Sequence, residues 1–264
     1  MKENHVYILR VQFLGFRYSG WQKQPNLRTI EGMLVKTLKF IVPGVPFKIL
    51  GAGRTDAKVS ALAAAFTLTF KESPIQNMDH FIGLFNANLP LDIRILSMEE
   101  TKSDFNIILD AKIKEYVYLF SFGQKNHPFC APFMANFLED LDIESMKKAA
   151  QLFVGTHDFS TYTSRLQKNT KTVRTIISCE IRPNTLLKAN FFPEDSYAFH
   201  VSGAGFMRYQ IRMMMGALVL LGKGELSLEN IRSSLIAGSE IQLTYVAPGS
   251  GLVLNGLEFA KDES

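Results

Sequence analysis

The sequence has few of the features that mark disulfide-rich, metal-binding or secreted proteins. Only two of its 264 residues are cysteine and only five are histidine. Cys130 and Cys179 lie in unrelated segments without a CxxC spacing, so the sequence predicts neither a disulfide framework nor a metal site. This sparing use of cysteine is typical of a reducing compartment, and we expect a cytoplasmic protein.

Long hydrophobic runs are also absent. The longest apolar candidate, MMMGALVLLG, follows Arg208 and Arg212 and is too short to cross a bilayer. The first residues, MKENHVYILRVQF, lack the apolar core and small-residue cleavage site of a secretory signal. The sequence therefore predicts a soluble protein that has no membrane partner.

The overall composition is that of a folded globular chain. Hydrophobic residues make up 47% and charged residues 20%, which argues against extended disorder. The net charge of +4 leaves room for a polyanionic partner without requiring one. No short-period repeat is visible, which argues against a solenoid.

The apolar pattern predicts strands and helices in both halves of the chain. In the first half it predicts strands over 6–14, 47–50, 66–70 and 93–98, a helix between Thr29 as N-cap and Pro43, and a short helix over 78–86. In the second half it predicts strands over 115–122, 173–181, 197–202 and 252–259, and helices over 143–153, 206–221 and 228–236. The fold class is therefore α+β, with two subdomains at 1–104 and 105–264 and mainly antiparallel sheets.

One loop between two predicted strands, GAGRTDAKVSA at 51–61, stands out chemically. Loops that join strands often carry functional residues, because the sheet holds them in place. Taken alone, Asp56 fits a turn or cap residue, and Arg54 fits a surface arginine in a weak ion pair. The four letters GRTD do not by themselves separate catalysis from turn chemistry.

The segment GRTDAKVSA resembles the active-site segment of the TruA family of tRNA pseudouridine synthases, whose pattern is close to G-R-T-D-x-G-V-x-A. Further segments follow in the order of that family: FLGFRYSGWQKQPNLRTIEGML, NANLPLDIRI, KEYVYLF, VGTHDFSTY, TVRTI, GAGFMRYQIRMMMGAL and APGSGLVL. The resemblance covers nearly the whole chain, which makes an accidental match improbable.

The resemblance implies a fold and an activity. The fold would be that of the pseudouridine synthases, with its two subdomains joined across a central RNA-binding cleft. The activity would be isomerisation of uridine to pseudouridine in the anticodon stem–loop of tRNA, at positions 38–40, without metal or cofactor. The active form would be a homodimer, and one subunit would help to present the RNA to the other.

The resemblance also assigns roles to individual residues. Asp56 would be the nucleophile, since a carboxylate can attack or stabilise the electron-poor ribose carbon as the base leaves. Arg54 would pair with Asp56 and then hold the displaced nucleotide, and Arg212 would keep Asp56 ionised. The remaining residues implied in substrate binding are Tyr118, which would stack on the target base, Leu252, which would lie against the uracil, and the basic residues Arg208, Lys168 and Lys171. Without the resemblance, Tyr118 and Leu252 read equally well as core residues, and the cations as solvated surface charges.

Four positions depart from the family pattern. Lys58 stands where a glycine is usual, so a turn that favours positive φ carries a side chain. Ser60 stands where bacterial members usually have histidine. Ile108 and Leu14 replace the expected arginine and acidic residue, which bears on RNA binding more than on chemistry.

Two other classes of function remain open on the sequence. The first is a non-catalytic tRNA-binding protein or RNA chaperone derived from this family, which would bind tRNA without turnover. The second is a carboxylate enzyme that hydrolyses free nucleosides, which would release uracil but leaves the basic segment RLQKNTKTVR unexplained.

Overall fold

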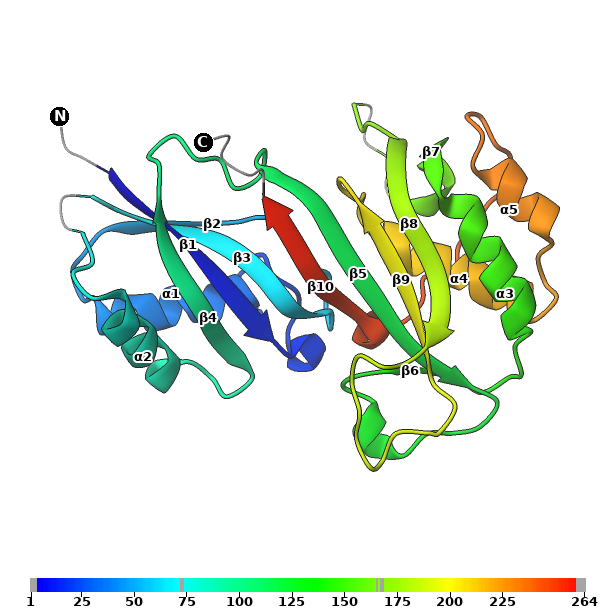
Figure 1. The fold of residues 1–264 in the computed structure, drawn as a ribbon, viewed down its shortest axis with the longest axis horizontal. Coiled ribbons are helices and arrows are strands. Elements are labelled where there is room, and N and C mark those ends of the chain that lie inside the picture. The colour runs from blue at the N-terminus through cyan, green and yellow to red at the C-terminus, as the bar shows by residue number, and fades with distance from the viewer. Residues whose placement is uncertain (1–3, 72–73, 165, 167–168, 260–264) are drawn as a thin grey trace. The chain divides into compact units, whose positions relative to one another are not determined.

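The computed structural model describes residues 4–71, 74–164, 166 and 169–259. The chain forms two compact units: unit 1 contains residues 1–112 and 254–264, and unit 2 contains residues 113–253. Both units combine strands with helices (Figure 1), which confirms the predicted α+β class. The predicted subdomains, 1–104 and 105–264, stay a prediction; in the two units the last residues of the chain are grouped with the first.

Unit 1 is built on a mainly antiparallel sheet. Its strands are β1 (Asn4–Phe13), β2 (Phe47–Gly51), β3 (Ser60–Lys71), β4 (Ile93–Thr101) and most of β10 (Leu252–Phe259). The strand order is β4-β1-β3-β10, and β2 pairs with β3. The helices are α1 (Ile30–Ile41) and α2 (Met78–Asn88). The pairs β1–β3, β1–β4 and β2–β3 are all antiparallel.

Local sequence signals explain the first strand and helix. Tyr7, Leu9 and Val11 are almost completely buried, as the two-residue period of β1 predicts. Val6 and Ile8 on the other face are buried as well. The hydroxyl of Thr29 accepts a hydrogen bond from the backbone N–H of Gly32 at 3.2 Å, which confirms Thr29 as the N-cap of α1.

The strands of unit 2 are also mainly antiparallel. They are β5 (Ala111–Phe122), which begins at the unit boundary, β6 (Ala135–Phe137), β7 (Gly155–Asp158), β8 (Val173–Pro183) and β9 (Tyr197–Gly203). The order β5-β9-β8-β7 is antiparallel throughout, and β6 adds to β5 in parallel. The helices are α3 (Ile143–Ala150), α4 (Gln210–Gly222) and α5 (Leu228–Ser234). The sequence did not predict the short strands β6 and β7.

Helix α4 begins four residues later than the apolar pattern predicts, at Gln210 rather than at Phe206. The preceding residue, Tyr209, has φ 63° and ψ 0°, which is left-handed backbone that an α-helix cannot contain. Arg208 therefore lies in a turn before the helix. The predicted helix over 206–221 would have included Arg208, and this part of the prediction was wrong.

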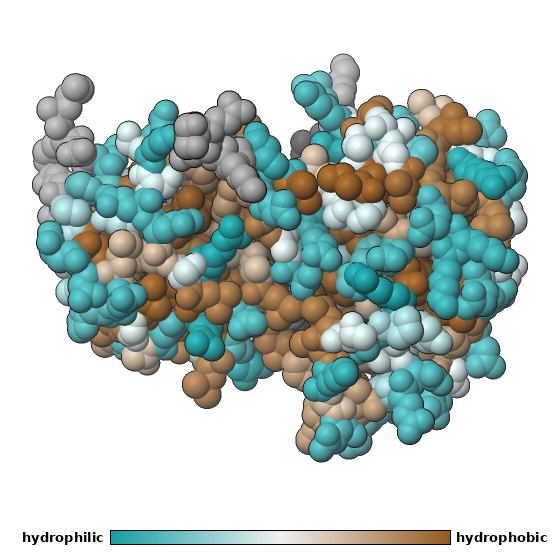
Figure 2. Space-filling view, in the orientation of Figure 1, coloured by the Kyte–Doolittle hydropathy of each residue, from teal (hydrophilic) through white to brown (hydrophobic). Residues whose placement is uncertain are grey.

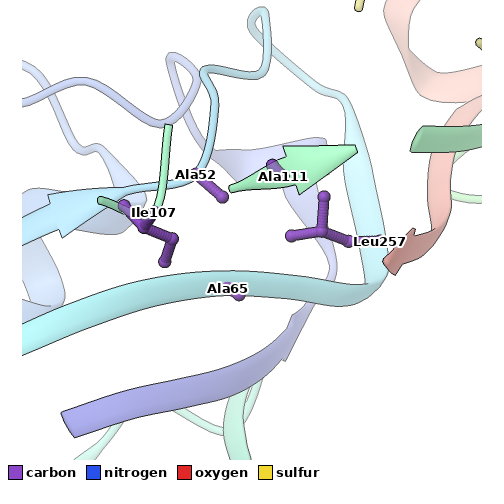
Figure 3. Packing of buried hydrophobic residues seen from close by; sticks show 5 residues of the cluster. All are labelled: Ala52, Ala65, Ile107, Ala111 and Leu257. Carbon is purple, nitrogen blue, oxygen red and sulfur yellow. The ribbon is translucent and has the colours of Figure 1, made fainter. Parts of the chain in front are cut away.

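A small apolar cluster closes unit 1 at the point where the chain leaves and re-enters it. Its buried members come from the loop after β2, from β3, from the segment before β5, from the start of β5 and from β10: Ala52, Ala65, Ile107, Ala111 and Leu257 (Figure 3). Arg10 of β1 donates to the Leu257 carbonyl at 2.7 Å and lies 4.7 Å from the ring centre of Phe259. The cluster therefore fixes the end of β10 beside the strand that follows the GRTD segment.

Neither unit presents an unbroken apolar surface on the face drawn in Figure 2, where hydrophilic and hydrophobic residues alternate over both. Among the residues that the structure describes, no helix has the length and apolar content that a membrane crossing requires.

Candidate active site

The GRTD segment forms the loop between β2 and β3. β2 ends at Gly51 and β3 begins at Ser60, so Arg54 and Asp56 project from a short connection between two paired strands. Asp56 is half-buried and Arg54 is exposed. Because both ends of the loop are held in the sheet, the Asp56 carboxylate has a defined position within unit 1.

The backbone of Gly20 and Trp21 packs directly against this loop. The Trp21 N–H donates to the Thr55 carbonyl at 3.1 Å, and Trp21 is buried between the rings of Phe13 and Phe66 at centroid distances of 6.1 and 6.2 Å. Gly20 has φ +95°, and a Cβ on it would lie 2.6 Å from the Thr55 carbonyl oxygen. The backbone of the GRTD loop thus approaches Gly20 as closely as only glycine allows.

Lys58 retains the turn despite the side chain it carries. Its φ is 67°, in the left-handed region that favours glycine, and its backbone N–H donates to the Tyr18 carbonyl at 3.0 Å. Its ammonium lies 5.6 Å from the ring centre of Phe16, a distance at which a cation–π contact is favourable. Lys58 therefore adopts left-handed backbone, which glycine adopts without strain.

Ser60 contributes a buried hydrogen bond at the base of the loop. Its hydroxyl accepts from the backbone N–H of Gly15 at 2.9 Å. A Cβ on Gly15 would lie 1.9 Å from the Val59 carbonyl oxygen, so the two backbone segments are in direct contact here. Ser60 thus joins the segment after β1 to the start of β3.

We predict that Ser60→Ala destabilises the protein by about 1–3 kcal/mol, because the buried Gly15 N–H loses its acceptor. The shift is measured as the midpoint of urea unfolding. Ser103→Ala, at an exposed turn position of the same unit, is the control and should shift stability by less than about 0.5 kcal/mol. Equal shifts in the two variants would contradict the role of the Ser60 hydroxyl.

A polar network around Asp92 holds the segment that carries Tyr18. The Tyr18 hydroxyl donates to Asp92 Oδ1 at 2.5 Å, and Arg17 Nη2 donates to Asp92 Oδ2 at 2.7 Å. Arg28 lies 4.8 Å from the ring centre of Tyr18 and donates to its hydroxyl oxygen at 3.1 Å. Since the Tyr18 carbonyl accepts from Lys58, this network helps to position the far end of the GRTD loop.

The network shifts the pKa values of its members in opposite directions. Burial raises the pKa of the Asp92 carboxyl, but hydrogen bonds from Tyr18 and Arg17, together with the charge of Arg17, outweigh burial, and the net pKa lies below its ordinary value. Burial and the hydrogen bond to Asp92 raise the pKa of Tyr18 to about 12. Asp92 is therefore ionised and Tyr18 neutral at pH 7.

This arrangement predicts a pH-dependent contribution to stability. Because the pKa of Asp92 is lower in the folded than in the unfolded chain, its stabilisation is complete above the unfolded pKa of about 4 and is lost as the pH falls through the folded pKa. Asp92→Asn should cost about 1–2 kcal/mol at pH 7 and progressively less below about pH 4. Urea unfolding of both proteins between pH 7 and pH 3 tests this; Asp195→Asn, at an exposed turn, is the control. A difference that stays constant with pH would contradict the ionic role.

Tyr118 lies in the middle of β5 and is completely buried. Its hydroxyl donates to the Pro248 carbonyl at 2.8 Å, and a Cβ on Gly251 would lie 2.8 Å from its ring. Burial raises the pKa of Tyr118 well above its ordinary value, and the charge of Arg212 partly opposes this shift. The complete burial of this ring was not part of the sequence prediction, which placed it against a base.

Arg212 lies on the first turn of α4 and is tied to the same segment as Tyr118. Its Nε donates to the Ala247 carbonyl at 2.7 Å, and the Ala247 N–H donates to the Arg212 carbonyl at 3.1 Å. Leu252, at the start of β10, is buried. Residues 247–252 therefore bring three predicted site residues, Tyr118, Arg212 and Leu252, together within unit 2.

The predicted phosphate-binding residues are placed differently. Arg208 is exposed in the turn before α4, and Lys171 is exposed just before β8. Lys168 lies outside the described residues. Arg174, in the same basic segment, is half-buried in β8 opposite His157.

Several residues that shape the site carry no signal in the local sequence. Gly20 and Trp21 were part of the family resemblance, but no role followed from it. Tyr18 and Asp92 are 74 positions apart in the chain and meet only in the fold. Gly20 was the one available clue, since a close approach between two backbones commonly needs a residue without a Cβ.

Comparison with known proteins agrees with the resemblance. Residues 149–260 match a family model described as tRNA pseudouridine synthase. The chain is 32% identical over 255 residues to tRNA pseudouridine synthase A 2 of Bacillus thuringiensis subsp. konkukian, covering 96% of this chain and 99% of the relative. It is 31% identical over 253 residues to tRNA pseudouridine synthase A of Thermodesulfovibrio yellowstonii, covering 93% and 96%, and 34% identical over 255 residues to tRNA pseudouridine synthase A 2 of Clostridium tetani, covering 94% and 96%. From similarity that extends over almost the full length of these relatives, we conclude that the chain belongs to the tRNA pseudouridine synthase A (TruA) family.

Proposed function

We propose that this protein is a tRNA pseudouridine synthase that isomerises uridines of the anticodon stem–loop, with Asp56 as the nucleophile. The observation that carries the proposal is the full-length similarity to synthases, combined with an intact GRTD loop that Gly20, Trp21 and Tyr18 hold in place. The reaction is an isomerisation and needs no net reactant. The N1–C1′ bond breaks, the uracil turns, C5 bonds to C1′, and C5 loses its proton while N1 gains one.

Each site residue has a chemical role in this proposal. The ionised Asp56 oxygen attacks or stabilises the electron-poor ribose as the base leaves. Arg212 supplies the positive charge that keeps Asp56 ionised, and Arg54 occupies the space of the displaced nucleotide. Tyr118 and Leu252 contact the uracil, which requires the buried ring of Tyr118 to become accessible when the RNA binds. Arg208, Lys168 and Lys171 contact phosphates.

The assembly and location are proposed with the activity. We propose a cytoplasmic homodimer that acts on tRNA, as the resemblance to the family implies. Sedimentation equilibrium with and without tRNA tests the dimer directly. A monomer that turns over tRNA at the same specific activity at all concentrations would overturn this part alone.

Retention of the left-handed turn at Lys58 argues against the non-catalytic alternative. Lys58, which stands where the family pattern has glycine, adopts the left-handed backbone that glycine favours, and Asp56 and Arg54 are present. The exposed Ile108, in place of an arginine, affects at most one surface contact. These observations favour an enzyme over a protein that only binds tRNA.

Tritium release from tRNA labelled at uridine C5 tests the proposal. A synthase releases tritium to water in proportion to the pseudouridine found in nucleoside digests. A nucleosidase releases free uracil instead, and a binding protein releases neither. A transcript whose anticodon-arm uridines are replaced by cytidine should lose the signal if the anticodon stem–loop is the substrate; unchanged release from that transcript would overturn this assignment.

A further inference from the structure

Tyr209, the residue before α4, has a backbone conformation that is unusual for an aromatic residue. Among the described residues, only three other than glycine have positive φ: Asn26, Lys58 and Tyr209. Asparagine adopts this conformation readily, whereas a tyrosine does so against steric resistance between Cβ and the following carbonyl. Such a conformation persists when the surroundings require it, so the place that the side chain reaches calls for an explanation.

The ring of Tyr209 lies beside two arginine side chains. The guanidinium carbon of Arg212 is 5.0 Å from the ring centre, and that of Arg208 is 4.9 Å from it. Both distances fall within the range of a cation–π interaction. Arg208 Nη2 also donates to the phenol oxygen of Tyr209 at 3.2 Å. One aromatic side chain therefore contacts both basic residues that precede or begin α4.

The ring of Tyr209 packs against a guanidinium that is also bonded to the backbone. The Arg212 Nε donates to the Ala247 carbonyl at 2.7 Å, which holds one edge of the guanidinium plane. The Tyr209 ring centre lies 5.0 Å from the guanidinium carbon and restricts movement of that plane. The carbonyl and the ring therefore both contribute to where the charged end of Arg212 lies.

The turn itself does not depend on the ring. The Met207 N–H donates to Gln210 Oε1 at 2.9 Å, and the Thr163 hydroxyl donates to the Arg208 carbonyl at 3.0 Å. The first α4 hydrogen bond runs from the Met213 N–H to the Tyr209 carbonyl at 2.9 Å and uses backbone alone. A residue that accepts left-handed backbone without a ring could therefore keep this turn.

We propose that Tyr209 is a positioning residue that holds the guanidinium of Arg212 in its working orientation and, through its phenol, secures Arg208. This inference deepens the proposed function and rests on it for the effect on turnover. The left-handed backbone of Tyr209 then has an explanation, because this conformation places the ring beside Arg212.

Two substitutions separate the ring from the backbone. Tyr209→Phe keeps the ring and removes only the phenol that Arg208 contacts. Tyr209→Asn removes the ring but suits left-handed backbone, so the thermal midpoint should equal or exceed that of the natural protein. We expect Tyr209→Asn to lower kcat about tenfold. Tyr209→Phe should leave kcat within about twofold and raise KM for tRNA by at most a few-fold.

A readout independent of activity accompanies the kinetics. The Arg212 Nε–H resonance, assigned by comparison with Arg212→Lys, should exchange slowly with water in the natural protein and in Tyr209→Phe, and rapidly in Tyr209→Asn. If Tyr209→Asn does not fold, Tyr209→Gly repeats the measurement with the least restricted backbone. Slow exchange in the ringless variant would overturn the proposal even if the natural protein showed no synthase activity.

The kinetic outcomes distinguish the two proposals. If the natural protein releases no tritium, the proposed function is refuted, and the exchange measurement alone then decides the role of Tyr209. A natural protein and a Tyr209→Asn variant with equal kcat leave the synthase standing and refute the positioning role. Equal losses of kcat in Tyr209→Phe and Tyr209→Asn would also refute it, because the ring would then not be what matters.

Discussion

Replacing Asp56 with asparagine is expected to abolish tritium release from C5-labelled tRNA while leaving tRNA binding nearly unchanged. Asparagine has almost the shape of aspartate but lacks the negative oxygen that attacks or stabilises the ribose carbon. Loss of a nucleophile commonly lowers kcat by at least about 10,000-fold, and we expect a fall of that order here. Single-turnover assays with enzyme in excess measure it without contributions from product release.

The matched control is Asp104→Asn, which removes the same charge from an exposed turn of unit 1. This variant should retain kcat within about twofold, since an isolated surface charge contributes little. Filter binding of tRNA at several salt concentrations shows whether either variant has lost affinity. Residual turnover of Asp56→Asn above one per cent of the natural rate, after deamidation has been excluded by mass spectrometry, would remove Asp56 from the centre of the mechanism.

The parts of the fold that sequence patterns predict are those set by neighbouring residues. The N-cap at Thr29 is local, and the structure confirms it. The alternation in β1 holds only in part, because Val6 and Ile8 are buried as well as the residues of the opposite face. The start of α4 was misplaced because Tyr209 adopts a left-handed conformation that helical periodicity cannot reveal. The strands β6 and β7 were missed because three or four residues are too few to establish a period.

The candidate site shows the same division. Asp56 and Arg54 were identifiable because the GRTD letters are contiguous and match a family. The supports of that loop were not, because the contacts of Gly20 with Thr55 and of Tyr18 with Asp92 join distant segments. Sequence patterns therefore indicated which side chains are candidates for the chemistry, and the fold was needed to identify the residues that hold their loop in place.

The close approach at Gly20 leads to the second large prediction. An alanine Cβ at this position would lie 2.6 Å from the Thr55 carbonyl oxygen and 3.1 Å from the Asp56 carbonyl carbon. Both contacts are with backbone, so the clash cannot be relieved by rotating a side chain, and the loop itself must move. Because a displacement of about 1 Å from the reactive geometry can cost 100-fold in rate, Gly20→Ala is expected to lower kcat by about that factor.

Gly44→Ala separates this displacement from the general cost of positive φ. Gly44 has φ +77°, close to the +95° of Gly20, but nothing lies within 4 Å of the Cβ that alanine would add. Each variant should lose about 1 kcal/mol of stability through its backbone conformation, and Gly20→Ala should lose more because of the clash with Thr55. Only Gly20→Ala should also lose kcat, because only there does the added carbon clash with the backbone of Thr55 and Asp56. If kcat fell equally in both variants, the loss would follow from reduced stability, and Gly20 would have no special role in placing the nucleophile. A normal kcat in Gly20→Ala would show that the loop can shift at Thr55 without moving the Asp56 carboxylate.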